Sequence, residues 1–139
     1  MNRTIARARA MQLIYESEMG GDGGEETRID LLGVEPNEEE ADYMERMFKG
    51  VSENMSRLDA DIAAHLRGWT LERLSRVDLA ILRLGAYELM LREVSARVVI
   101  NEAVELGKQF GGDDSAAFIN GILGKVADKA TKENGKEEA

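Results

Sequence analysis

Cysteine is absent from the sequence, which excludes disulfide bonds and thiolate metal sites. Histidine occurs once, at His65, and a single imidazole without neighbouring ligands does not hold a metal ion. No apolar run approaches the roughly 20 residues that cross a bilayer, and the N-terminus lacks the apolar segment of a signal peptide. These absences predict a soluble cytoplasmic protein that has no metal site and no cofactor.

Proline is also scarce, with Pro36 alone, whereas alanine, leucine, glutamate, methionine and arginine are frequent. Residues of this kind favour helices, so we expect an all-α fold. A chain of 139 residues can bury a core of its own, as one domain or as two small helical lobes that share a core. The end of the chain, 131–139, is charged and contains Gly135, so we expect it to fray.

The formal net charge of −9 argues against a general affinity for nucleic acid, because an acidic protein repels a polyanion. The charge is uneven, however, since the first fifteen residues contain Arg3, Arg7 and Arg9 but no acidic residue. Arginines in a first helical turn oppose the helix dipole and therefore do not serve helix stability. Two interpretations stay open: a local basic patch, or a helix end that is simply solvated.

Apolar residues spaced by three and four predict helices over 3–19, 37–66, 77–91, 98–110 and 116–130. Asn37 and Glu40 can form a capping box, and we expect the helix that follows to be a single long one. Ser75 and Ser95 are the expected N-caps of the next two helices. A further short helix is expected over 27–33.

The helix expected over 77–91 carries apolar residues on nearly every side, which indicates that other helices surround it. Its polar residues Arg83 and Glu88 should then be enclosed and paired with neighbours. Just before this helix, Trp69 follows a glycine, and we expect it to be a buried plug between the two halves of the chain. His65 receives no role.

The turn between the last two predicted helices concentrates several signals. Gly111 and Gly112 can take the left-handed conformation that ends a helix, and Asp113 or Asp114 can cap the helix that follows. Beyond the turn, Phe118 falls at the edge of its helix's apolar stripe rather than at the centre. We expect function at this turn.

Four parts of the sequence are distinctive, namely Arg73–Leu84, Tyr87–Leu89, Val99–Leu106, and Asp114–Ser115 with Phe118–Leu123. They resemble the signature segments of the NusB transcription antitermination factors. The resemblance extends from about Arg3 to Val126. It implies a three-helix N-terminal lobe at about 1–67, packed on a C-terminal helical lobe at about 68–130. It also implies binding of a boxA-like single-stranded leader RNA together with the small-subunit ribosomal protein that serves as NusE. With RNA polymerase, the pair would suppress termination, chiefly in ribosomal-RNA transcription.

Transferred residue by residue, the resemblance implies an RNA-binding surface of nine residues: Arg3, Arg7, Gln12, Tyr15, Glu72, Asp78, Phe110, Asp114 and Phe118. Arginine suits phosphates, aromatic faces stack on unpaired bases, and carboxylates accept hydrogen bonds from amino or imino groups. We expect the Arg3/Arg7 strip and the Phe110/Phe118 turn to form one surface. Because Thr4 and Ile5 stand where the family continues its basic run, we expect weak RNA binding until a basic partner supplies charge.

Two other classes of function are weighed against this one. The chain could be a helical protein-interaction module or a homodimer, with solvated arginines and aromatics buried against another chain. An enzyme is disfavoured, because no nucleophile lies beside a base and no glycine-rich cofactor loop follows a strand. The acid pair Glu102 and Glu105 lies on the polar face of its helix and is expected to be solvated.

Overall fold

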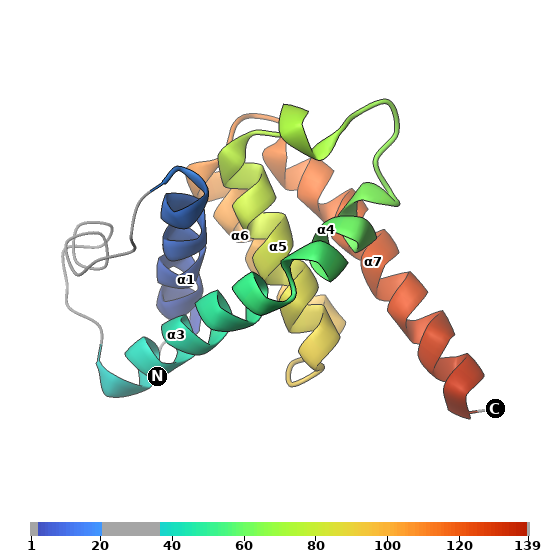
Figure 1. Ribbon diagram of the computed structural model, residues 1–139, viewed down its shortest axis with the longest axis horizontal. Coiled ribbons are helices and arrows are strands. Elements are labelled where there is room, and N and C mark those ends of the chain that lie inside the picture. Colours follow the sequence, from blue (N-terminus) through green and yellow to red (C-terminus); the bar gives the residue numbers. More distant parts are fainter. Residues whose placement is uncertain (1–2, 21–36, 139) are drawn as a thin grey trace.

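The computed structural model of the protein describes residues 3–20 and 37–138, with side chains as far as residue 131. Over these residues the chain forms six α-helices and one 3-10 helix, and no strand (Figure 1). The elements are α1 (Arg3–Glu18), α3 (Glu38–Glu53), α4 (Met55–Ala63), η1 (Leu71–Arg73), α5 (Arg76–Leu91), α6 (Ala96–Phe110) and α7 (Ser115–Glu138). The all-α prediction is confirmed. The short helix expected over 27–33 lies outside the described residues.

Helix α5 is the centre of the fold and contacts α1, α3, α4, α6 and α7. Every residue from Leu79 to Leu89 is buried, as the apolar pattern predicts. Ser75 caps the helix, because its side chain accepts a hydrogen bond from the backbone N–H of Asp78. A helix surrounded in this way fixes the position of every element around it. These include η1, which precedes its N-terminal end, and α7, which packs against it.

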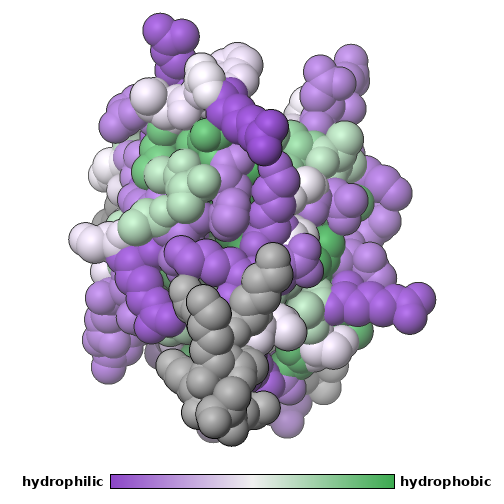
Figure 2. Space-filling view, turned by 90° about the vertical axis from the view of Figure 1, so that its right-hand side faces the viewer, coloured by the Kyte–Doolittle hydropathy of each residue, from purple (hydrophilic) through white to green (hydrophobic). Residues whose placement is uncertain are grey.

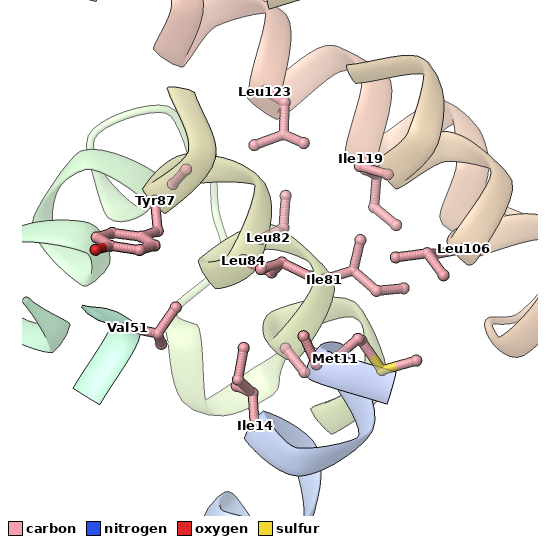
Figure 3. Packing of buried hydrophobic residues seen from close by; sticks show 14 of the residues in the cluster. Met11, Ile14, Val51, Ile81, Leu82, Leu84, Tyr87, Leu106, Ile119 and Leu123 are labelled. Carbon is pink, nitrogen blue, oxygen red and sulfur yellow. The ribbon is translucent and has the colours of Figure 1, made fainter. Parts of the chain in front are cut away.

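One buried cluster passes through the whole molecule (Figure 3). Met11 and Ile14 of α1 pack on Ile81 and Leu84 of α5, and Leu123 of α7 belongs to the same cluster. The cluster therefore includes residues from both predicted lobes, 1–67 and 68–130. A division into two lobes stays a prediction. Among the described residues, no helix is long and apolar enough to cross a membrane.

The expected single helix over 37–66 is wrong, because the structure divides it at Asn54. The capping box at Asn37 and Glu40 is present and begins α3, as predicted. At Asn54 the backbone leaves the helical region, with φ −112° and ψ 16°, and the side chain donates a hydrogen bond of 2.8 Å to the carbonyl of Gly50. Asparagine competes for backbone partners in this way, so α3 ends at Glu53 and α4 begins anew at Met55.

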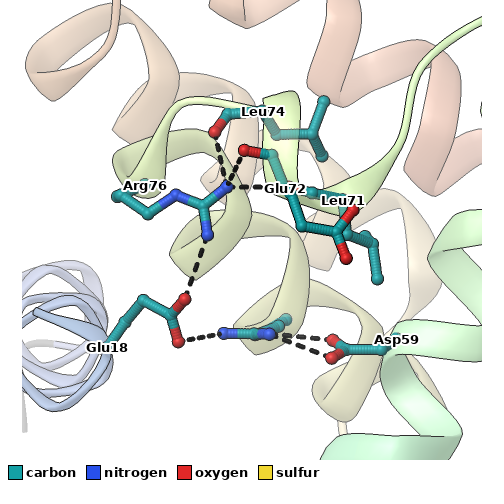
Figure 4. A network of polar contacts seen from close by, with 7 residues as sticks. Glu18, Asp59, Leu71, Glu72, Leu74 and Arg76 are labelled. Atoms are coloured by element: carbon teal, nitrogen blue, oxygen red, sulfur yellow. Dashed lines mark hydrogen bonds and ion pairs between the residues drawn. The ribbon is translucent and has the colours of Figure 1, made fainter.

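Polar residues join α1, α4 and α5 (Figure 4). Buried Arg83 donates to both oxygens of Asp59, at 2.8 and 2.9 Å, and to Glu18 at 3.1 Å. The prediction that Arg83 is enclosed and paired is confirmed. Arg76 also binds Glu18 and donates to the carbonyl oxygen of Leu74 at 2.7 Å, which ties η1 to the start of α5.

Candidate nucleic-acid interface

A hollow of about 440 Å³ lies between the α6–α7 turn and the segment that leads into α5. Six of the residues that line it carry aromatic or charged side chains: Trp69, Arg73, Asp78, Asp113, Asp114 and Phe118. Asp78, Asp114 and Phe118 were predicted as site residues, and the structure brings them together here. The hollow is therefore the place where three of the five predicted C-terminal site residues meet, while Glu72 and Phe110 do not line it.

A close contact between Gly111 and Ser115, and not a left-handed glycine, makes the α6–α7 turn tight. Gly111 has φ −93° and ψ −169°, and positive φ values occur among the described glycines only at Gly20 and Gly68. The left-handed conformation expected at Gly111 and Gly112 is therefore wrong. A Cβ atom on Gly111 would lie 2.5 Å from Oγ of Ser115, so the close approach of the chain requires glycine. The N–H of Gly112 donates to the same Oγ at 2.9 Å, which closes the turn and directs Phe118 to the hollow.

Trp69 was not predicted as a site residue, and its predicted role as a buried plug is wrong. Trp69 is 58% exposed. It lines the hollow as part of the segment that leads into α5, whereas Asp113 and Asp114 line it from the α6–α7 turn. The signal that could have identified it is local. Gly68 takes a left-handed conformation with φ 73°, which places Trp69 in a loop and outside any helical apolar stripe.

Asp78 lies in the first turn of α5, where a carboxylate is favoured by the helix dipole. Its Oδ1 atom is buried and has no hydrogen-bond partner within the part of the chain that the structure describes. Glu72, in contrast, is exposed on η1. Hydrogen bonds from its own backbone N–H and from the Thr70 side chain lower the pKa of Glu72, so this carboxylate is charged at neutral pH. Both acids remain able to accept hydrogen bonds.

Arg7 does not belong to this surface, and its expected place on an exposed basic strip is wrong. Its side chain is 4% exposed and donates to both oxygens of Glu88, at 2.8 and 3.0 Å. Burial lowers the pKa of Arg7, but the hydrogen bond and charge of Glu88 outweigh it and raise the pKa, so Arg7 stays charged. Tyr43 donates to Glu88 at 2.9 Å, and burial followed by the charge of Glu88 raises the pKa of Tyr43. The prediction that Glu88 is enclosed and paired is confirmed.

The other predicted residues of α1 also lie outside the hollow. Arg3 places its guanidinium 5.2 Å from the ring centre of Tyr43. Because Glu18 binds Arg76, the C-terminal end of α1 lies beside η1 and Arg3 lies roughly 22 Å away along the helix (Figure 1). Gln12 donates to Glu16 at 3.0 Å.

The last two predicted aromatic residues, Tyr15 and Phe110, are half-buried against the core. Phe110 ends α6 directly before the turn, but it does not line the hollow. Of the nine predicted residues, Asp78, Asp114 and Phe118 line the hollow and the other six do not.

A model of the NusB family matches residues 4–128. This chain belongs to the NusB family. The transcription antitermination protein NusB of Clostridium botulinum (strain Kyoto / Type A2) is 42% identical to it over 142 residues, which cover 91% of this chain and 99% of that protein. Family membership confirms the resemblance seen in the sequence and the prediction that the chain is not an enzyme.

Solved structures share this NusB fold. A structure of NusB from T. maritima gives a TM-score of 0.78 at 32% identity and covers 92% of each chain. A crystal structure of the antitermination factors NusB and NusE in complex with dsRNA gives a TM-score of 0.79 at 24% identity, covering 91% of this chain and 96% of that one. The second likeness establishes the shared fold and nothing further.

Proposed function

We propose that this chain is a transcription antitermination factor that binds a boxA-like single-stranded leader RNA together with the ribosomal protein that serves as NusE. With RNA polymerase in the bacterial cytoplasm, the complex would help transcription pass terminators, chiefly in ribosomal-RNA operons. The observation that carries the proposal is the hollow in which Asp78, Asp114 and Phe118 meet. Aromatic faces and carboxylate acceptors at one place are what recognition of unpaired bases needs.

The charge of the hollow indicates how RNA would be held. Its lining carries three carboxylates, Asp78, Asp113 and Asp114, and one guanidinium, that of Arg73. Phosphates are repelled by such a lining, whereas the amino and imino groups of bases are attracted. This surface therefore contacts bases, and another source must supply most of the phosphate contacts.

A basic partner is the natural source of that charge, since the chain itself carries a net −9. We propose that the ribosomal partner binds an apolar strip of the C-terminal lobe. Leu89, Met90 and Val126 line a groove of about 310 Å³ between α4, α5 and α7, which favours this placement. Arg57, Arg92 and Lys129 line the same groove, so its apolar residues and not its charge would attract a basic partner. On the side of the molecule shown in Figure 2, hydrophobic surface appears as patches between hydrophilic side chains. The fold is also that of a NusB protein crystallised with NusE and dsRNA.

The alternative, a homodimer, could use the same groove. Light scattering over a range of protein concentrations distinguishes the two, because a dimer that uses this groove gives way to a heterodimer when the ribosomal partner is added. A homodimer that persists at saturating concentrations of the ribosomal partner would show that the two interactions do not use the same groove.

The decisive experiment is a titration of labelled boxA-like RNA at two salt concentrations, with and without the ribosomal partner. We expect a small salt dependence for the chain alone and a steeper one for the complex, since each phosphate contact to single-stranded nucleic acid adds about 0.7 to the slope. A double-stranded RNA of the same sequence serves as competitor control.

Two variants test the site itself. Phe118→Ala should weaken RNA binding, whereas Phe48→Ala should not, because Phe48 is also a half-buried phenylalanine but lies on α3 and does not line the hollow. Equal RNA affinity of the Phe118→Ala complex and the unmodified complex would contradict the proposal, and so would indifference to RNA sequence.

A further inference from the structure

Trp69 is an anomaly of the fold that the proposed function leaves unexplained. Among the described residues, three large apolar side chains are exposed, namely Met19, Trp69 and Val98. Of these, Trp69 has the largest aromatic face, and it is 58% exposed although indole is costly to leave in water. It lies in the loop before η1, where Arg76 binds the carbonyls of Leu71 and Leu74 and holds the following turn in place. The backbone that follows Trp69 is thus held in place, while the residue itself stays exposed.

A second aromatic lines the same hollow. Phe118 reaches it from the first turns of α7, on a helix that α5 and α6 hold in place. The two rings come from segments almost fifty residues apart in the chain, and between them is a space of about 440 Å³. Binding sites for small ligands have volumes of about 300–1,000 Å³, so this space admits a single nucleobase with its ribose.

The polar side of the hollow shows which edge of a base would fit. Asp78 has a buried Oδ1 with no hydrogen-bond partner among the described residues, and a buried acceptor without a donor is unfavourable. The terminal torsion of an aspartate is soft, so a ligand donor can bring this carboxyl group into a better orientation. Asp113 and Asp114 add further acceptors, and the single donor side chain with a full charge is that of Arg73. The hollow is therefore rich in acceptors and suits a ligand edge rich in donors.

We propose that Trp69 and Phe118 enclose one unpaired base of the bound RNA, and that Asp78 selects guanine by accepting from its N1–H and N2–H groups. This inference rests on the proposed function and extends it by naming the base and the residue that stacks on it. Guanine presents two adjacent donors, which match the two oxygens of a carboxylate. Adenine and cytosine present one amino group on that edge, and uracil presents one N–H between two carbonyls that a carboxylate repels.

The chain provides its own probe for the stacking step, because Trp69 is its only tryptophan. The fluorescence of the full-length protein is followed, with excitation where the three tyrosines do not absorb, during titration with an oligouridine that carries a single guanine. The same oligouridine with adenine, or without substitution, gives the comparison. We expect quenching that saturates together with binding, which is measured separately by anisotropy of a label on the RNA. Quenching should be strongest for the guanine-containing RNA.

Variants separate stacking from base selection. Trp69→Ala should weaken binding of the guanine-containing RNA by about 5- to 150-fold, the range of one lost base stack, and Trp69→Phe should recover most of it. Asp78→Asn should remove the preference for guanine over uracil. Val98→Ala is the matched control, since Val98 is an exposed apolar residue near the start of α6 and the hollow lies at the end of that helix.

The outcomes distinguish this inference from the function on which it rests. RNA binding that neither quenches Trp69 nor weakens in Trp69→Ala would overturn the inference and leave the antitermination proposal standing. Binding that is quenched but equal for all bases would overturn the assignment of guanine. Absence of RNA binding with and without the ribosomal partner would overturn both proposals.

Discussion

Replacing Arg7 by methionine tests whether this arginine stabilises the fold or binds RNA. Arg7 and Glu88 are 4% and 6% exposed, and two hydrogen bonds of 2.8 and 3.0 Å join them. The methionine keeps most of the buried volume but leaves the Glu88 carboxylate inside the protein, where the Tyr43 hydroxyl still donates to it at 2.9 Å. Removing one partner of a buried ion pair costs about 3–5 kcal/mol, a large share of the roughly 5–15 kcal/mol by which a typical protein is stable.

The free energy of unfolding, measured in urea, checks this value. Arg46→Met is the matched control, because Arg46 and Glu93 form an ion pair that is 54% and 50% exposed, and such pairs contribute about 0–1 kcal/mol. Adding Glu88→Leu to Arg7→Met should recover part of the loss, since no buried charge then remains. Recovery should be incomplete, because the buried Tyr43 hydroxyl loses its acceptor at a cost of about 1–3 kcal/mol.

The result also bears on function. If Arg7→Met lowered stability by no more than Arg46→Met and still abolished RNA binding, Arg7 would act at the RNA surface and the reasoning from burial would be refuted. We expect the opposite, with RNA affinity retained wherever the variant remains folded.

Two further predictions concern packing and pH. Gly50→Ala should destabilise the protein by about 1–3 kcal/mol in urea unfolding, because the new Cβ would lie 2.0 Å from the Tyr87 ring. Gly124→Ala is the control, since its new Cβ would have nothing within 4 Å, and it should stabilise the protein by about 1 kcal/mol. Equal effects of the two substitutions would contradict the packing of α3 on α5. Burial raises the pKa of Glu18, but the hydrogen bonds and charges of Arg83 and Arg76 lower it more, so its folded pKa lies below the unfolded value of about 4.3. Its contribution to stability is therefore present at neutral pH and lost as the pH falls through the folded pKa, so the stability difference between the protein and Glu18→Gln should disappear in acid; a difference that persists there would contradict the ion pair.

The helices and their caps could be predicted from the sequence, because their signals are local. Apolar spacing placed α5 and α6, and the capping residues Asn37, Ser75 and Ser95 all accept the expected hydrogen bonds. The break at Asn54 was missed because the apolar stripe continues across it without interruption. A periodic pattern shows which face is buried, but not where one helix ends and the next begins.

The site could be predicted only in part, because its members are defined by distant partners. Arg7 lies on a strip with Met11, which is 1% exposed, yet nothing local shows that Glu88, 81 residues later, lies opposite. The exposure of Trp69 is likewise not visible in the sequence, because tryptophan is highly buried on average. Its actual exposure depends on how the loop before η1 meets the α6–α7 turn, which is a property of the folded chain alone.

The central position of α5 also has a consequence for how the protein is made. When only the first 67 residues have emerged from the ribosome, α1, α3 and α4 are present but α5, which all three contact, is not. At that stage α1 and α3 can pack only on each other, and the parts of Met11, Ile14 and Val51 that face α5 stay open to solvent until the segment 76–91 emerges. During translation α1, α3 and α4 therefore complete their packing only after α5 has emerged. A chain that ends before Arg76 should be degraded by proteases and should not form a smaller folded protein.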